Sequence, residues 1–154
     1  MTDPTVTTSD LTVSVERTVA ASRAVVFRAW TDPDQLAAWY GPAHMDTPRD
    51  RIRIDLRVGG RYELTMVRQD GEGEVSIGYE IVELAEPELL VLRCDPVPHA
   101  GMRERGIVRI ELHAQDGGTR LVLTDGPFPA DGARGAEAGW NAALDKLEGR
   151  LLGR

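Results

Sequence analysis

Two runs decide the fold of this chain: Trp39-Tyr40-Gly41-Pro42 and Asp55-Leu56-Arg57-Val58-Gly59-Gly60. A helix does not continue through a Gly-Pro pair, so the first run predicts the end of a short helix. Paired glycines are typical of tight connections, so the second run predicts a turn between two strands. At this spacing the two runs predict an architecture, and neither of them by itself indicates a reaction or a ligand.

The segments around these runs predict strands on both sides and helices at two places. Residues 11–18 alternate apolar and polar side chains, as a half-buried strand does. Ser22 is a helix-capping residue, and Asp32-Pro33 is the start signal of the second short helix. Turn signals then separate six further strand-like segments, at residues 51–56, 61–68, 75–84, 89–95, 104–114 and 119–125.

The last element is the clearest helix of the chain. Trp140, Leu144, Leu147 and Leu151 recur at the spacing of one helical face. An apolar stripe of this length must be buried, and a curved antiparallel sheet around the helix buries it best. We therefore expect an α+β, helix-grip fold: about seven antiparallel strands wrapped around a long C-terminal helix, with two short helices after the first strand. Such curvature often leaves a cavity between sheet and helix.

The composition fits a single domain of an acidic, water-soluble protein. We expect one domain over residues 11–154, preceded by a disordered polar tail at residues 1–10. The net charge of −7 disfavours nucleic acid and membrane as partners. One cysteine, Cys94, excludes an intramolecular disulfide, and we find neither a signal peptide nor a membrane span. These features indicate a cytoplasmic protein.

Five motifs in order resemble the activator of heat-shock protein 90 ATPase homologue family, within the START-like (SRPBCC, helix-grip) superfamily. Residues 27–33 look like the family's Phe-x-Ala-Trp-Thr-x-Pro segment, and the two runs above look like its Trp-Trp-Gly-Pro and Asp-x-Arg-x-Gly-Gly. Residues 78–81 match a Gly-x-Tyr-x-Glu-Ile-like strand, and Gly139-Trp140 opens a Gly-Trp-x3-Leu-x2-Leu helix. The resemblance covers residues 11–152.

The resemblance implies a range of functions that share an internal apolar cavity. Its first implication is binding of a small hydrophobic or aromatic molecule between sheet and C-terminal helix. A cyclase-like or hydrolase-like enzyme acting on a polyketide-type substrate is the second. Stimulation of the heat-shock protein 90 ATPase ranks third, because the chain lacks the additional N-terminal domain of the co-chaperone. The fold alone does not choose among these functions.

The candidate ligand-binding residues are the aromatic, sulfur-containing and apolar side chains expected to face the cavity. Methionines adapt to ligands of different shape, and the hydroxyls of Tyr62 and Tyr79 could orient a ligand. Trp39 and Tyr40 either form a wall of the cavity or simply pack the second helix on the sheet. The full set is Trp39, Tyr40, Met45, Tyr62, Leu64, Met66, Ile77, Tyr79, Leu92, Cys94, Met102, Val108, Ile110, Phe128, Trp140 and Leu144.

No constellation for catalysis, metal binding or a cofactor stands out in the sequence. The spacing of His44, His99 and His113 fits no metal motif, and no nucleophile motif is present. Four glutamates, at positions 63, 80, 83 and 111, alternate with apolar residues and should lie on the outer face. An enzyme would need a polar group in the cavity, from Tyr62, Tyr79 or His44. The sequence does not decide whether the protein forms a homodimer, through an exposed strand edge or the strand-side face.

Overall fold

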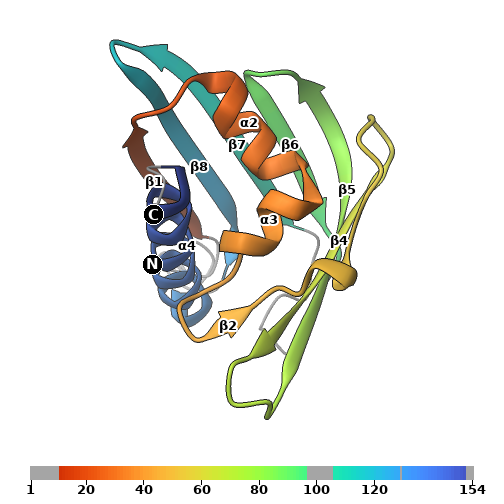
Figure 1. The fold of residues 1–154 in the computed structure, drawn as a ribbon. Helices are drawn as coiled ribbons and strands as arrows, with labels where there is room; N and C mark the ends of the chain where they lie inside the picture. The colour runs from red at the N-terminus through yellow and green to blue at the C-terminus, as the bar shows by residue number, and fades with distance from the viewer. Residues whose placement is uncertain (1–10, 97–105, 129, 152–154) are drawn as a thin grey trace, which may run out of the picture.

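The computed structural model describes residues 11–96, 106–128 and 130–151. Figure 1 shows a curled sheet with helices inside its curve. The elements in chain order are β1 (Leu11–Val19), α2 (Arg23–Thr31), α3 (Pro33–Trp39), β2 (Met45–Asp46), the short 3₁₀ helix η1 (Arg49–Arg51), β3 (Ile52–Ile54), β4 (Arg61–Arg68), β5 (Glu74–Ala85), β6 (Leu89–Cys94), β7 (Gly106–Gln115), β8 (Gly118–Phe128) and α4 (Ala130–Leu151).

All strands belong to one antiparallel sheet. Its order is β1-β8-β7-β6-β5-β4-β2, and β3 also pairs with β4. The first and last long strands of the chain are therefore neighbours. The predicted α+β helix-grip fold is confirmed, with one strand more than expected because the two-residue β2 carries no sequence signal of its own.

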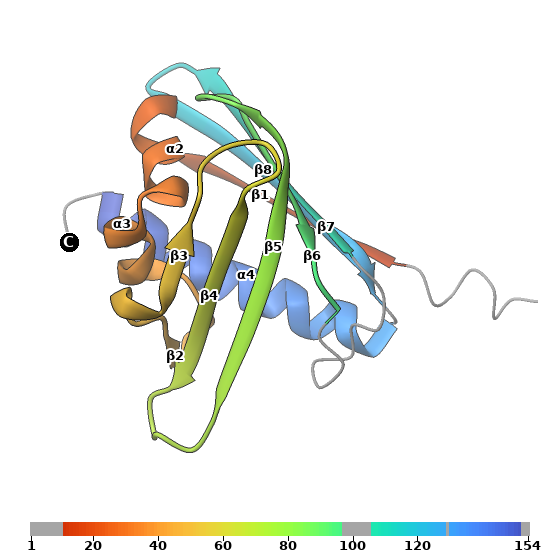
Figure 2. The ribbon, with the colours of Figure 1, turned by 90° about the vertical axis from the view of Figure 1, so that its right-hand side faces the viewer.

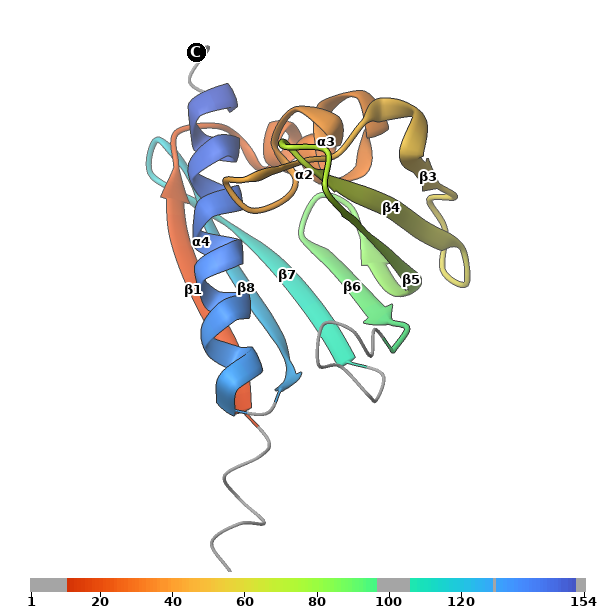
Figure 3. The same cartoon turned by 90° about the horizontal axis from the view of Figure 1, so that it is seen from below.

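Helices α2, α3 and α4 lie on the concave side of the sheet. In Figure 2, α4 runs across the strands, and Figure 3 shows the sheet curving around it. Helix α4 packs mainly on β1 and α3 and also contacts β8. Ser22 and Asp32 cap α2 and α3 with their side chains, as predicted from the sequence. Helix α3 ends before Gly41, whose φ of +110° only glycine adopts readily.

An aromatic cluster joins the helices to one another at the end of the sheet that α2 and α3 cover. The ring centroids of Trp30 and Trp39 are 4.6 Å apart, and those of Trp30 and Trp140 are 5.9 Å apart. The indole N–H of Trp39 donates to the Ala29 carbonyl oxygen at 3.0 Å. The Tyr62 hydroxyl donates to the carbonyl oxygen of Trp30. This end of the molecule, called the closed end below, is filled with side chains.

The outer face of the sheet carries ion pairs. The four glutamates expected there pair with arginines of the sheet: Glu63 with Arg61 on the same strand, Glu80 with Arg93 on the neighbouring β6, Glu111 with Arg109 on the same strand, and Glu83 of β5 with Arg109 of β7, across β6. His113 is exposed and lies 3.1 Å from a Glu111 carboxylate oxygen. These charged groups therefore face away from the interior, as the alternation of the strands predicts.

The Gly59-Gly60 pair connects β3 to β4 and also holds this turn against β5. The Gly59 N–H donates to the Ile81 carbonyl oxygen at 2.8 Å, and the Ile81 N–H donates to the Gly60 carbonyl oxygen at 2.9 Å. Gly59 has a φ of +88°. A Cβ on Gly60 would lie 2.0 Å from the carbonyl oxygen of Asp55, which is backbone and cannot move aside easily. The run therefore sets the course of the backbone.

The two glycines should respond differently to substitution by alanine. Gly60→Ala should lower the free energy of unfolding by more than about 3 kcal/mol, because the new methyl group collides with backbone. Gly59→Ala should cost only about 1–2 kcal/mol, the cost of a left-handed conformation in open space. Urea unfolding of the two variants measures the difference. Equal losses would show that the close approach at Gly60 is not the constraint.

Candidate functional site

A cavity of about 350 Å³ lies between α4 and the concave face of the sheet. Its wall combines the segment after α3 with one end of the five strands β4 to β8 and the first half of α4. The residues on the wall are Tyr40, Gly41, Pro42, Met66, Ile77, Tyr79, Cys94, Val108, Asp125, Phe128, Gly132, Gly135, Ala136, Gly139, Trp140 and Ala143.

The cavity exists because the two halves of α4 carry side chains of different size. The first half faces the sheet with Gly132, Ala136 and Gly139, and the second half with Leu144 and Leu147, which are fully buried. A Cβ placed on Gly139 would meet no atom within 4 Å. Small residues thus leave open the space that leucines fill one to two turns later.

Eight of the predicted cavity residues lie on its wall. They come from the segment after α3, from β4 to β8 and from α4: Tyr40, Met66, Ile77, Tyr79, Cys94, Val108, Phe128 and Trp140. In each long strand these residues occupy one end only. In β8, for example, Phe128 is on the wall, whereas Leu121 and Leu123 are buried in the core.

Seven of the predicted residues do not lie on this wall. They are Trp39, Met45, Tyr62, Leu64, Leu92, Ile110 and Leu144, all buried in the hydrophobic core. Each of these side chains is nevertheless buried in the interior. Trp39 and Tyr62, for example, lie at the closed end, which helices and aromatic rings fill. Met102 lies outside the described residues.

The three polar side chains that an enzyme could use, Tyr62, Tyr79 and His44, lie in different environments. Tyr79 is on the cavity wall. Tyr62 is used within the core by its hydrogen bond to Trp30, and His44 is exposed. Among the three, only the Tyr79 hydroxyl therefore meets the requirement of a polar group inside the cavity.

Tyr40 and Tyr79 form a hydroxyl pair on the wall. Their hydroxyl oxygens are 3.0 Å apart, and either group can be the donor. Burial raises the pKa of both phenols well above the ordinary value. Both hydroxyls therefore stay protonated at neutral pH. The pair presents a hydrogen-bonding group on a wall that is otherwise mostly apolar.

Asp125 is the functional candidate that sequence reasoning missed. Its side chain projects inward from β8 with the same two-residue period as Leu121 and Leu123, so the signal was present in the alternation. Asp125 is only 6% exposed. Its Oδ2 atom accepts a 2.8 Å hydrogen bond from the indole N–H of Trp140, and its Oδ1 atom has no partner among the described residues. Burial raises the pKa of this carboxyl to about 6.

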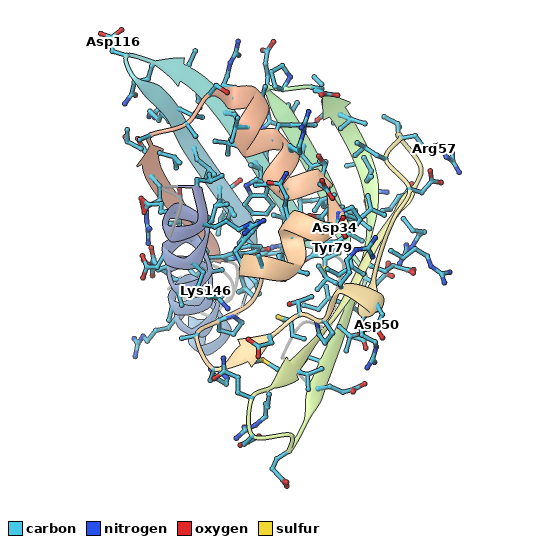
Figure 4. The ribbon with its side chains drawn as sticks, in the orientation of Figure 1. Asp34, Asp50, Arg57, Tyr79, Asp116 and Lys146 are labelled. Atoms are coloured by element: carbon cyan, nitrogen blue, oxygen red, sulfur yellow. The ribbon has the colours of Figure 1, made fainter. Side chains whose placement is uncertain are left out.

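Two side chains hold the segment after α3 against the rest of the cavity wall. The Thr47 hydroxyl donates to the Tyr40 carbonyl oxygen at 2.9 Å. The Lys146 ammonium, labelled in Figure 4, donates to the carbonyl oxygens of Pro42 and Met45 at 3.3 and 3.2 Å. Partial burial lowers the pKa of Lys146. These bonds fix Tyr40, Gly41 and Pro42 beside α4.

Within the described residues, no group of three His, Cys, Asp or Glu side chains could hold a metal ion. In the same part of the chain, no helix has the length and apolar character needed to cross a membrane. The features of the site that can act on a ligand are therefore the cavity, the Tyr40–Tyr79 hydroxyl pair and the buried carboxyl group of Asp125.

A curled antiparallel sheet that grips a long C-terminal helix, with a cavity between the two, defines a START-like protein of the helix-grip fold. The family model described as "Activator of Hsp90 ATPase homolog 1-like protein" matches residues 20–151, and the chain belongs to this family. The resemblance inferred from the five motifs is thereby confirmed. A search of curated proteins gave no significant match.

Several solved structures share the fold over nearly the whole chain. Protein CV1439 from Chromobacterium violaceum is 25% identical, with a TM-score of 0.79 over 90% of this chain and 94% of its own. The AHSA1-like protein from Aeromonas hydrophila is 23% identical, with a TM-score of 0.75 over 92% and 95%. CalU16 from Micromonospora echinospora is 22% identical, with a TM-score of 0.67 over 88% and 73%.

The buried carboxyl group should make the stability of the protein depend on pH in a defined direction. The folded pKa of about 6 lies above the ordinary 3.8, so the folded state binds the proton more tightly than the unfolded state. Stability should therefore fall as the pH rises from about 4 to about 6. The difference in pKa corresponds to about 3 kcal/mol at about 1.4 kcal/mol per pH unit.

The variant Asp125→Asn tests this expectation, because it removes the charge and keeps an acceptor for Trp140. Its gain in unfolding free energy over the wild type should grow between about pH 4.5 and about pH 8, by about 2 kcal/mol. The exposed Glu137→Gln on α4 is the matched control and should show no such growth. A gain that is constant over this range would contradict the assignment.

Proposed function

We propose that this protein binds a small hydrophobic or aromatic molecule in the cavity between α4 and the sheet. The observation that carries the proposal is the cavity itself, whose volume of about 350 Å³ falls in the range of small-molecule sites. An apolar cavity of about 150 Å³ already accommodates benzene. The volume here suits a ligand of roughly two rings, or an aliphatic body of the same size.

The chemistry of the wall supports the same function. Ligand sites are typically lined by apolar and aromatic side chains, with few polar groups that fix orientation. Here Phe128, Ile77 and Val108 supply the apolar surface, and Met66 can adjust to ligand shape. The Tyr40–Tyr79 hydroxyl pair supplies a hydrogen-bonding group. Since the wall is built on strands and a helix, it needs little ordering on binding.

Filling the cavity should abolish binding without unfolding the protein. Gly139→Leu places a side chain into open space on the cavity wall. It also replaces a glycine within a helix, which by propensity stabilises the helix by up to about 1 kcal/mol. The affinity for prodan, a small neutral fluorescent dye, should fall at least about tenfold, as measured by fluorescence titration.

Gly149→Leu is the matched control for this experiment. It makes the same change in the same helix, also where a Cβ meets no atom within 4 Å, but off the cavity wall. Prodan should bind this variant as it binds the wild type. Unaltered binding by a folded Gly139→Leu would show that the cavity is not the binding site.

A second candidate function, a cyclase-like or hydrolase-like enzyme, is favoured by one specific observation. Asp125 is a carboxyl group in the cavity with a pKa of about 6, which suits a general acid or base near neutral pH. Its charge also contributes to the raised pKa of Tyr40 and Tyr79, which places the two phenols near it.

Hydrolysis of p-nitrophenyl acetate tests the hydrolase form of this candidate. An enzyme should release p-nitrophenol faster than buffer does, and Asp125→Asn should lower that rate by at least about a hundredfold. If p-nitrophenol is released at the same rate with the wild type, with the variant and in buffer alone, the protein does not hydrolyse this ester, and the hydrolase candidate is contradicted.

A further inference from the structure

One carboxylate oxygen of Asp125, a residue of the cavity wall, accepts no hydrogen bond from the described residues. Its Oδ1 atom is buried and has no partner among the described residues, whereas Oδ2 is held by the Trp140 indole N–H. A buried carboxylate oxygen without a donor is unfavourable, because it has lost water and gained nothing in return. Asp125 also belongs to the cavity wall, so a molecule bound in the cavity lies beside this carboxyl group.

The surroundings of Asp125 favour a cationic donor. On the neighbouring strands it is paired in register with Val13 and Val108, which are apolar. Two phenols, those of Tyr40 and Tyr79, lie near it, and both stay protonated. As far as the structure describes the wall, it carries no Lys, Arg or His. The formal charge of the described wall is therefore negative above the pKa of Asp125.

Two basic side chains nearby are engaged elsewhere. The Lys146 ammonium donates to the carbonyl oxygens of Pro42 and Met45. Arg17 on β1 pairs with Asp145 and Glu148 of α4, at 3.0 and 2.7 Å. Neither side chain lies on the cavity wall, so neither neutralises the buried carboxylate.

Aromatic side chains beside Asp125 hold its carboxylate in place. The Trp140 ring is fixed in place by its hydrogen bond to the carboxylate. The Tyr40 ring packs edge-on against it, with centroids 5.7 Å apart and an angle of 86° between the planes. Both residues belong to the cavity wall. The carboxylate is therefore held at the edge of the Trp140 ring before a ligand arrives.

We propose that the ligand is a small apolar amine, whose ammonium group donates to Oδ1 of Asp125 while its aromatic or aliphatic body fills the cavity. This inference rests on the proposed binding function and specifies its ligand class. An anionic ligand of the same size would be repelled, and a neutral one would lack the charge pairing.

Three probes of nearly equal size separate these possibilities: 2-phenylethylamine, 2-phenylethanol and phenylacetate. Calorimetric titration at about pH 7.5 should show the amine binding the wild type at least about tenfold more tightly than the alcohol, with the acid weakest. Asp125→Asn should reduce the affinity for the amine at least about tenfold and leave that for the alcohol within about threefold. Phenylacetate should bind the variant better than the wild type.

The exposed Glu137→Gln controls for the loss of one negative charge and should leave all three affinities unchanged. Equal affinity of the wild type for the amine and the alcohol would overturn the inference. So would an equal loss of amine affinity in Asp125→Asn and Glu137→Gln. Thermal unfolding of Asp125→Asn establishes that the variant is folded.

The binding of prodan separates failure of this inference from failure of the proposed function. If prodan binds the wild type and is lost in Gly139→Leu while the amine shows no preference, the cavity binds ligands and the amine class is wrong. If neither prodan nor any of the three probes binds the wild type, both the function and the ligand class are wrong.

Discussion

The packing of α4 into the curled sheet is the constraint on which the rest of the structure depends. The second half of this helix is anchored by Leu144 and Leu147, which are fully buried in the core. The first half carries glycine and alanine toward the sheet, so it spans the strands without filling the space beneath it. One helix therefore stabilises the fold at one end and creates a cavity at the other, and a change at Gly139 affects only the second role.

Trp140 lies at the boundary between these two halves and connects them. Its ring belongs to the aromatic cluster with Trp30 and Tyr40, and its indole N–H fixes the Asp125 carboxylate on the cavity wall. The orientation of the carboxylate is therefore set by the same residue that anchors the helix. Since a side chain held in this way loses little freedom when a ligand arrives, the site is largely preorganised.

The sequence predicted the fold and the phase of the interior residues, but not where along each element the core ends. The alternation in β4, for example, places both Tyr62 and Met66 inside, and only Met66 reaches the wall. That difference depends on which helix covers each end of a strand, which is a tertiary property. Asp125 was missed for another reason: the inward alternation of its strand was followed only to Leu123, although the same period places Asp125 inside.

A buried carboxyl group such as Asp125 needs a physical reason to be present, because its ionised form destabilises the folded state above the pKa of about 6. An asparagine would keep the acceptor for Trp140 without this cost, so the hydrogen bond alone does not require an aspartate. The negative charge becomes favourable when a cation enters the cavity, since the pair then forms where little water screens it. The stability of the free protein and the affinity for a cationic ligand are thus opposed at this position, as is common where a binding site requires a charge that folding does not.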